Sequence, residues 1–176
     1  VQTCALPIYL EADVVAMTVD TFSAQRAYQL AAFFREKGSR IIMGGFHPTM
    51  MPGECLRYAD AVAIGEAEDT WGDIIQDLRK NDLKNRYVSR NSSDLSRSIY
   101  DYSVFKGKKY NRLGLVQFSR GCRFDCDFCS IHAFYKGSVR CRDVSEIIEE
   151  IRQRKEKYLF FIDDNIFADK KKAIEL

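Results

Sequence analysis

Short apolar runs alternate with amphipathic stretches through the first half of the chain. Residues 13–19, 40–43 and 61–64 are apolar over the length of a strand. Residues 24–37 and 70–79 carry apolar side chains at the spacing of an amphipathic helix. Apolar runs of this length between helices are typical of parallel strands buried on both faces. The pattern therefore predicts an open α/β sheet, a fold that binds ligands beyond the carboxyl ends of its strands.

A second α/β unit is predicted in the last third of the chain. Its elements follow in the order strand, cysteine-bearing loop, helix and strand, at residues 113–119, 120–130, 144–155 and 158–162. This order of elements is that of the opening of a βα barrel.

The domain organisation follows from these two units. Residues 1–8 resemble a translated sequencing adapter, so we exclude them from the fold interpretation. We expect an α/β domain over residues 9–80, a linker over 81–112 and the start of a barrel domain over 113–176. A helix begins just before Leu176 with no stop signal, so we expect a fragment truncated at both ends.

Composition excludes several classes of protein. The net charge of +2 is too small to indicate a nucleic-acid partner. No apolar run approaches the ~20 residues of a membrane-spanning helix, and no secretory leader is evident, so we predict a cytoplasmic protein. Three of the six cysteines lie within eight residues, which favours a metal site in a reducing compartment over a disulfide framework.

The clustered cysteines, Cys122, Cys126 and Cys129, have the spacing C-x3-C-x2-C. Three thiolates can ligate three irons of a four-iron, four-sulfur cluster and leave the fourth iron open to a substrate. Two alternatives remain: a zinc site completed by His132, and a ferredoxin-like electron carrier completed by Cys141. A lone buried thiol is the simpler interpretation of Cys141, and also of Cys55.

This spacing, with an aromatic residue before the last cysteine, resembles that of the radical S-adenosylmethionine (SAM) superfamily. The resemblance extends from about residue 113 to the end. It implies that the open iron binds SAM, whose reductive cleavage yields a 5′-deoxyadenosyl radical. It also implies that Phe128 lies near the adenine, and we expect Phe124 and Phe128 to keep water off the sulfurs. Many relatives have a Gly-Gly-Glu element that binds the methionine amino group of SAM. Here Asp163, Asp164 and Asn165 stand in that place, so we assign them to SAM.

The amino-terminal domain resembles the cobalamin-binding domain that is fused to many radical SAM enzymes. The resemblance rests on Gly44-Gly45-Phe46-His47-Pro48-Thr49 and Gly65-Glu66, each after a predicted strand. The residues assigned to cobalamin are Thr18, Thr21, Gly44, Gly45, Phe46, His47, Gly65 and Glu66. The glycines would let the backbone approach a bulky ligand. The Asp-x-His-x-x-Gly element that supplies a cobalt ligand in some relatives is absent, and we expect His47 to be hydrogen-bonded at the strand end.

The sequence therefore predicts an incomplete Rossmann-like cobalamin-binding domain followed by the first βα units of a radical SAM, partial TIM-type barrel. The resemblance implies a cobalamin-dependent radical SAM enzyme that methylates an unreactive centre, with a cyclising or rearranging enzyme as the alternative. An electron donor such as flavodoxin or ferredoxin is implied as a partner. The substrate, a small molecule or a peptide, and the catalytic residues are not identified, and we expect the isolated fragment to be inactive.

Overall fold

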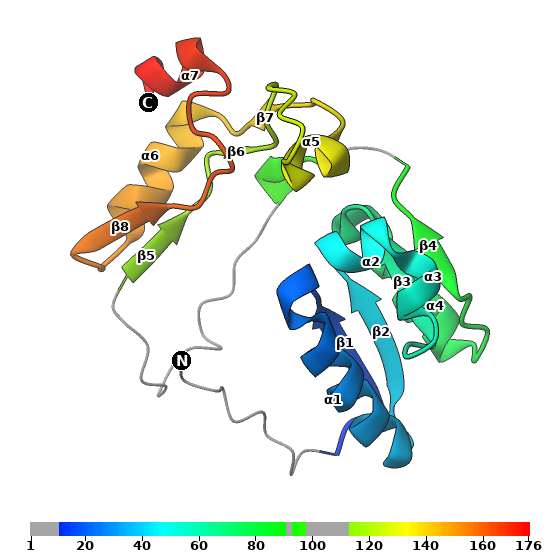
Figure 1. Cartoon of the computed structure of the whole chain (residues 1–176). Helices are drawn as coiled ribbons and strands as arrows, with labels where there is room; N and C mark the ends of the chain where they lie inside the picture. The colour runs from blue at the N-terminus through cyan, green and yellow to red at the C-terminus, as the bar shows by residue number, and fades with distance from the viewer. Residues whose placement is uncertain (1–10, 91–92, 98–112) are drawn as a thin grey trace. The chain divides into compact units, whose positions relative to one another are not determined.

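The amino-terminal half of the chain is organised around a parallel sheet. The structure, a computed structural model, describes residues 11–90, 93–97 and 113–176 (Figure 1). The chain divides after Ser93 into two compact units. In the first unit the strands are hydrogen-bonded in chain order, and they are β1 (Val14–Thr18), β2 (Arg40–Gly44), β3 (Ala61–Ile64) and β4 (Arg86–Val88). All three pairings are parallel, as the sequence predicts for this half.

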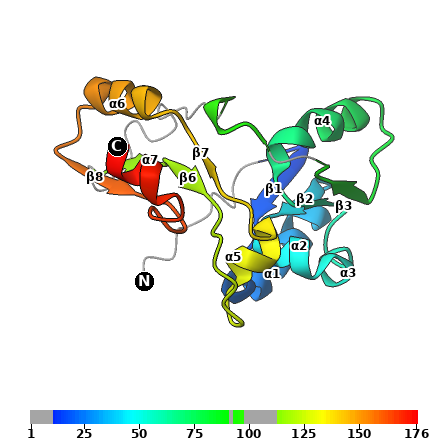
Figure 2. The same cartoon turned by 90° about the horizontal axis from the view of Figure 1, so that it is seen from above.

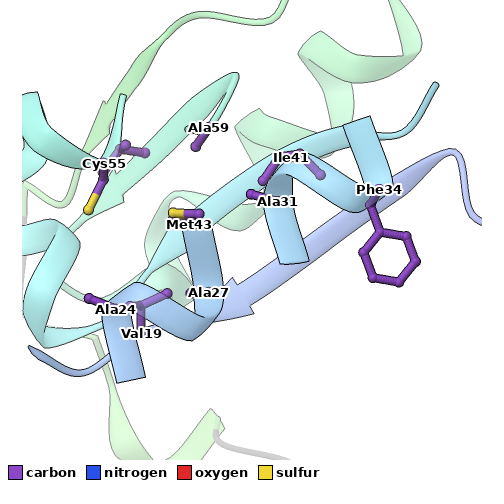
Figure 3. Close-up of a cluster of buried hydrophobic side chains, with 10 residues drawn as sticks. Val19, Ala24, Ala27, Ala31, Phe34, Ile41, Met43, Cys55 and Ala59 are labelled. Carbon is purple, nitrogen blue, oxygen red and sulfur yellow. The ribbon is translucent and has the colours of Figure 1, made fainter. Parts of the chain in front are cut away.

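Alternating side chains of the central strands build a core on each face of this sheet. Ile41, Met43 and Val62 pack with α1 (Ala24–Glu36) on one face (Figure 3). Neighbouring residues, among them Ile42 and Ala63, point to the opposite face and pack with Ile74 of α4 (Trp71–Arg79). Because successive strand residues point to opposite faces, continuous apolar runs are needed to fill both cores. The unit is therefore a layered α/β/α structure, as predicted.

The remaining elements of the first unit are short. Two helices, α2 (Phe46–Met50) and α3 (Pro52–Cys55), follow β2. Single 3-10 turns occur at η1 (Thr21–Ser23), η2 (Ala67–Asp69) and, at the start of the second unit, η3 (Leu95–Arg97). The segments after β1, β2 and β3 therefore begin with a turn or a short helix before the chain reaches a longer helix or the next strand.

Two features of this sheet differ from the prediction. Residues 86–88 lie within the predicted linker but form β4, because Tyr87 is buried and its hydroxyl donates to Asp77 of α4 at 2.8 Å. A strand of three residues with one buried side chain is too short to show the alternation of apolar and polar residues by which strands are recognised in a sequence. β1 was predicted to be buried on both faces, but it lies at the edge of the described sheet and is partly exposed. The predicted adapter segment, residues 1–8, and linker residues 98–112 lie outside the described residues.

The second unit contains a parallel pair of strands joined through a helix. β5 (Leu113–Val116) pairs in parallel with β8 (Tyr158–Phe161), and α6 (Val144–Gln153) lies between them in the chain. Ile147 of α6 is fully buried against Val116 and Phe118, so α6 covers one face of the pair (Figure 2). A short antiparallel pair, β6 (Ser119–Arg120) with β7 (Arg140–Cys141), and two helices, α5 (Ser130–Tyr135) and α7 (Lys170–Glu175), complete the unit.

This β–α–β arrangement is the one that the sequence predicts after residue 112. The helix and both strands lie within two or three residues of their predicted bounds. Within the described residues, no helix is long and apolar enough to cross a membrane.

Candidate functional site

The turn after β2 brings Gly44 and Gly45 against the end of β1. The amide of Val19 donates to the Gly44 carbonyl at 2.8 Å, and the amide of His47 donates to the Val19 carbonyl at 3.0 Å. Gly45 has φ of 102°, in the region that favours glycine. These bonds tie the start of α2 to the carboxyl edge of the sheet, where the sequence places the cobalamin site.

Gly45 packs closely against the end of β1. A Cβ at Gly45 would lie 3.0 Å from Cγ2 of Thr18 and 3.1 Å from the backbone nitrogen and oxygen of Val19. The space that a side chain would need at Gly45 is therefore filled by the chain itself. Thr18, which was also assigned to cobalamin, is exposed at the end of β1.

His47 is buried at the centre of a polar cluster at this edge. Its Nδ1 lies 3.2 Å from the Thr21 hydroxyl, and its Nε2 lies 2.9 Å from the Tyr28 hydroxyl. The Tyr28 hydroxyl also donates to Oε1 of Glu54 at 2.9 Å. A carboxylate only accepts, so the single phenol proton goes to Glu54 and Nε2 must donate to the phenol oxygen. In neutral His47, Nδ1 then accepts from Thr21.

The environment of Tyr28 keeps this arrangement fixed. Burial, together with hydrogen bonds to Cys55 and Glu54, raises the pKa of Tyr28 well above its usual value, so the phenol keeps its proton. Burial likewise raises the pKa of the Cys55 thiol. Both ring nitrogens of His47 therefore have partners, and neither is left for cobalt in this structure. This agrees with the expectation that His47 is hydrogen-bonded at the strand end.

Thr49 links the two glycine-bearing strand ends. Its hydroxyl donates to the Gly45 carbonyl at 2.8 Å and accepts from the amide of Gly65 at 2.9 Å. Gly65 also has a positive φ, 85°. Glu66, which the sequence assigns to cobalamin, accepts from the amide of Ser93 at 3.2 Å. Glu66 therefore also has a structural role, because it holds the segment that follows β4. Phe46, assigned to the same ligand, is partly buried as the first residue of α2.

An apolar surface at this edge was missed by sequence reasoning. Within described residues 11–90, the exposed large apolar side chains are Phe22, Met50, Met51, Trp71 and Val88. Each lies at the carboxyl end of a strand or in the segment that follows one. Phe22, next to Thr21, is 90% exposed. The hydrophobic pattern could not reveal that these residues are exposed, because an apolar residue in a connecting segment can equally well be buried in the core. The edge therefore combines hydroxyls, tight glycine turns and exposed apolar groups, a set that suits a large amphipathic ligand such as cobalamin.

The three clustered cysteines lie on the loop between β6 and α5. Cys122 and Cys129 are partly buried, Cys126 is exposed, and all three are free thiols. The amide of Cys129 donates to the Cys126 carbonyl at 2.9 Å, which closes a turn before α5. Among the residues that the structure describes, no group of three or more His, Cys, Asp or Glu is close enough to hold a metal ion. The donor chemistry, three free thiols on one short loop, nevertheless fits a cluster in which each cysteine binds a separate iron.

Asp163, Asp164 and Asn165 follow β8 and contact the chain that leads into this loop. Asp163 accepts from the backbone amides of Phe118 and Ser119 and from the Ser119 hydroxyl. Asp164 accepts from the amide of Gly121 at 2.8 Å. Nδ2 of Asn165 lies 3.6 Å from Sγ of Cys122. The three residues assigned to SAM are therefore already engaged with their own chain.

Other candidates near the loop are also placed by the structure. Nδ1 of His132 lies 3.2 Å from the Phe124 carbonyl, and its Nε2 lies 3.3 Å from Oδ1 of Asp125. Cys141 is partly buried against the core of the second unit, and burial raises the pKa of its thiol. Phe128 is 92% exposed and Phe124 is 51% exposed.

Comparison with known families agrees with the fold of the first unit. Residues 8–75 match the B12 binding domain family. This match covers the first three strands of the sheet and the turns that follow them. It ends within α4, before β4.

Curated relatives extend over most of the chain. The chain is 30% identical over 182 residues to bacteriochlorophyllide d C-8(2)-methyltransferase of Chlorobaculum tepidum, with 93% of this chain and 40% of that protein covered. It is likewise 30% identical over 175 residues to bacteriochlorophyllide d C-12(1)-methyltransferase of the same organism, covering 93% of this chain and 38% of that protein. Anaerobic magnesium-protoporphyrin IX monomethyl ester cyclase of Rubrivivax gelatinosus is 26% identical over 206 residues, with 94% of this chain and 36% of that protein covered. The chain thus spans well under half the length of these relatives.

Proposed function

Residues 8–75 of this chain match the B12 binding domain family. From this match we propose that the full-length protein is a cobalamin-dependent radical SAM enzyme that methylates an unreactive carbon. One observation carries the proposal. A B12-binding domain and a C-x3-C-x2-C loop in a β–α–β unit occur together in a chain related over 93% of its length to named methyltransferases.

In this proposal the first unit binds cobalamin at the carboxyl edge of its sheet. When bound, the cofactor would supply a cobalt centre that carries the methyl group. The exposed ring of Phe22 would contact the corrin, and the free face of Thr18 would offer its hydroxyl to the nucleotide tail. The buried cluster around His47 would hold the loop after β1 in position. His47 would not ligate the metal, because both of its ring nitrogens are hydrogen-bonded to other side chains.

The second unit would hold the cluster and SAM. When bound, the cluster would supply the electron that cleaves SAM. Cys122, Cys126 and Cys129 would each bind one iron and leave the fourth open for the amino and carboxylate groups of SAM. Phe128 projects into solvent from the loop and would be available to contact the adenine.

The test is reductive cleavage of SAM by the full-length protein. After anaerobic reconstitution with iron and sulfide, dithionite and SAM should yield 5′-deoxyadenosine even without the true substrate. Alanine at Cys122, Cys126 or Cys129 should abolish this product, because each thiol holds one iron. Cys141→Ala is the matched control and should leave the product and the iron content unchanged. A protein that holds its cluster but does not cleave SAM would instead favour an electron carrier.

A second reaction is favoured by a specific relative. The resemblance to a magnesium-protoporphyrin IX monomethyl ester cyclase supports ring closure as the alternative to methylation. SAM labelled in its methyl group separates the two reactions once the substrate is known. Methylation transfers the label to the product, whereas cyclisation leaves it in methionine.

A further inference from the structure

Acidic residues at the carboxyl end of β8 are bonded to the chain that leads into the cysteine loop. We propose that Asp163 and Asp164 are positioning residues that hold the entrance of this loop, and that they do not receive the amino group of bound SAM. The proposal rests on the proposed function, because it assigns residues of the same site. It reverses the assignment that the sequence alone suggests.

Asp163 makes the larger set of contacts. One carboxylate oxygen accepts from the Phe118 amide at 3.3 Å, and the other accepts from both the amide and the hydroxyl of Ser119, the hydroxyl at 2.6 Å. Ser119 is only 1% exposed, so these donors have little access to water as an alternative partner. Breaking them to bind an ammonium group would leave buried donors unpaired, which is unfavourable.

Asp164 fixes the residue immediately before the first cysteine. Its Oδ2 accepts from the amide of Gly121 at 2.8 Å. Gly121 has φ of 89°, and a Cβ there would overlap the Ser138 carbonyl oxygen. The Gly121 backbone is therefore bonded to Asp164 and packed closely against the Ser138 carbonyl.

Asn165 extends the same set of contacts to Cys122, the first of the three proposed iron ligands. Its Oδ1 accepts from the Phe167 amide at 3.0 Å, which orients the side chain so that Nδ2 faces Sγ of Cys122. Consecutive residues after β8 thus contact the segment from Phe118 to Cys122. A loop whose first ligand is already in place loses less conformational entropy when it binds a cluster.

The first experiment uses the metal-free full-length protein. Hydrogen–deuterium exchange of the amides in residues 118–122 is compared among wild type, Asp163→Asn and Asp164→Asn. The amide side chain keeps the size of the carboxylate but accepts hydrogen bonds less strongly. In each variant the amides of this segment should exchange roughly tenfold faster than in the wild type, which is the effect of losing about one hydrogen bond to a charged group. Asp127→Asn removes an exposed acid of the same loop and should leave the exchange unchanged.

The second experiment separates positioning from SAM binding. Ser119→Ala removes one donor to Asp163 and leaves its charge intact. If Asp163 positions the loop, the amides of residues 118–122 should also exchange faster in this variant, and it should retain less iron after reconstitution. If Asp163 instead binds the ammonium group of SAM, neither the exchange nor the iron content should change. Ser119→Ala also tests the role of Asp163 if circular dichroism shows that Asp163→Asn does not fold.

SAM titration of the fraction that retains iron completes the test. Wild type and the Asp163 and Asp164 variants should bind SAM with affinities that agree within a factor of about two. Unchanged exchange in both aspartate variants overturns the proposal, as does a loss of SAM affinity of roughly tenfold or more in them at normal iron content. If the wild type itself fails to bind SAM, the proposed function fails, while the exchange rates still decide whether these residues hold the loop.

Discussion

Gly45 sits where the close approach of β1 and α2 leaves no room for a side chain. Its positive φ and the 3.0–3.1 Å separations from a Cβ to Thr18 and Val19 both oppose any other residue. Its neighbour Gly44 differs in both respects. A Cβ there would make an ordinary contact with Ala63 at 3.5 Å, and its φ lies outside the glycine region. The two glycines of one motif therefore have different physical requirements.

We expect Gly45→Ala to lower the free energy of unfolding of the chain by about 1–3 kcal/mol, the cost of a strained backbone and a close contact. Gly44→Ala should change it by less than about 1 kcal/mol and serves as the matched control. Urea unfolding followed by circular dichroism measures both. Equal losses for the two variants would contradict this distinction.

Phe22 gives a test of the ligand site that leaves the fold unperturbed. Its side chain is 90% exposed, so Phe22→Ser should not change stability measurably. If the carboxyl edge binds cobalamin, loss of the ring should weaken hydroxocobalamin binding by the full-length protein roughly tenfold or more, as expected for a buried aromatic contact. Equilibrium dialysis gives the affinity. Glu36→Ser, an exposed change in the last turn of α1, should bind like the wild type.

At this scale the sequence predicted which residues gather at the carboxyl edge but not what each one does. His47 was correctly expected to be hydrogen-bonded, yet its partners Thr21 and Tyr28 lie 26 and 19 residues away along the chain, and no local pattern joins them. Phe22 was missed because exposure depends on what covers a residue in three dimensions. Asp163 was assigned to SAM from its place after a predicted strand, and no local pattern shows that its donor Ser119 lies in β6, 44 residues earlier.

At the scale of elements, α6 is joined to the strands beside it by two arginines that share Glu150. Arg142 donates to Glu150 at 2.6 Å and to the Gln117 carbonyl at 3.2 Å. Arg154 pairs with the same carboxylate and donates to the Leu115 carbonyl at 2.6 Å. Burial alone raises the pKa of the Glu150 carboxyl, but the hydrogen bonds from the two arginines outweigh it and hold that pKa below its usual value.

This shift makes the stability of the chain depend on pH with a definite sign. A carboxyl whose pKa is lower in the folded than in the unfolded state contributes stability that is fully present above its unfolded pKa, about 4.3. That stability is lost as the pH falls through the folded pKa. We therefore expect the wild-type free energy of unfolding to fall more steeply below about pH 5 than that of Glu150→Gln.

Urea unfolding at a series of pH values measures this slope. Glu149→Gln, an exposed change in the same helix, is the control and should keep the wild-type slope. Identical slopes for wild type and Glu150→Gln would show that the ion pairs do not couple protonation to folding.

The elements that the sequence predicted well are the long ones with a clear period. α1, α4 and α6 end within two residues of their predicted bounds, because each has one apolar face that packs on a sheet. The elements that it missed are short. β4 has a single buried residue, Tyr87, and α5, β6 and β7 surround the cysteine loop, where local hydrogen bonds rather than periodicity decide the structure.

At the scale of the whole molecule, the chain carries two units with different chemistry. The first unit has the parallel sheet and the family match of a B12-binding domain. The second has three free thiols on a loop whose entrance is held by residues after β8. The first unit extends past residue 80, where the sequence analysis ends the first domain, because β4 pairs with β3. In the proposed function, one polypeptide binds cobalamin through the first unit and an iron–sulfur cluster through the second.

Cobalt and iron analysis of the full-length protein tests this claim most directly. The protein is reconstituted anaerobically with iron, sulfide and hydroxocobalamin, and unbound cofactors are removed by gel filtration. If the proposed function is correct, about one cobalt and about four irons per polypeptide should elute in the same protein peak. Bound zinc without iron and sulfide, or a protein that retains iron but no cobalt, would contradict it.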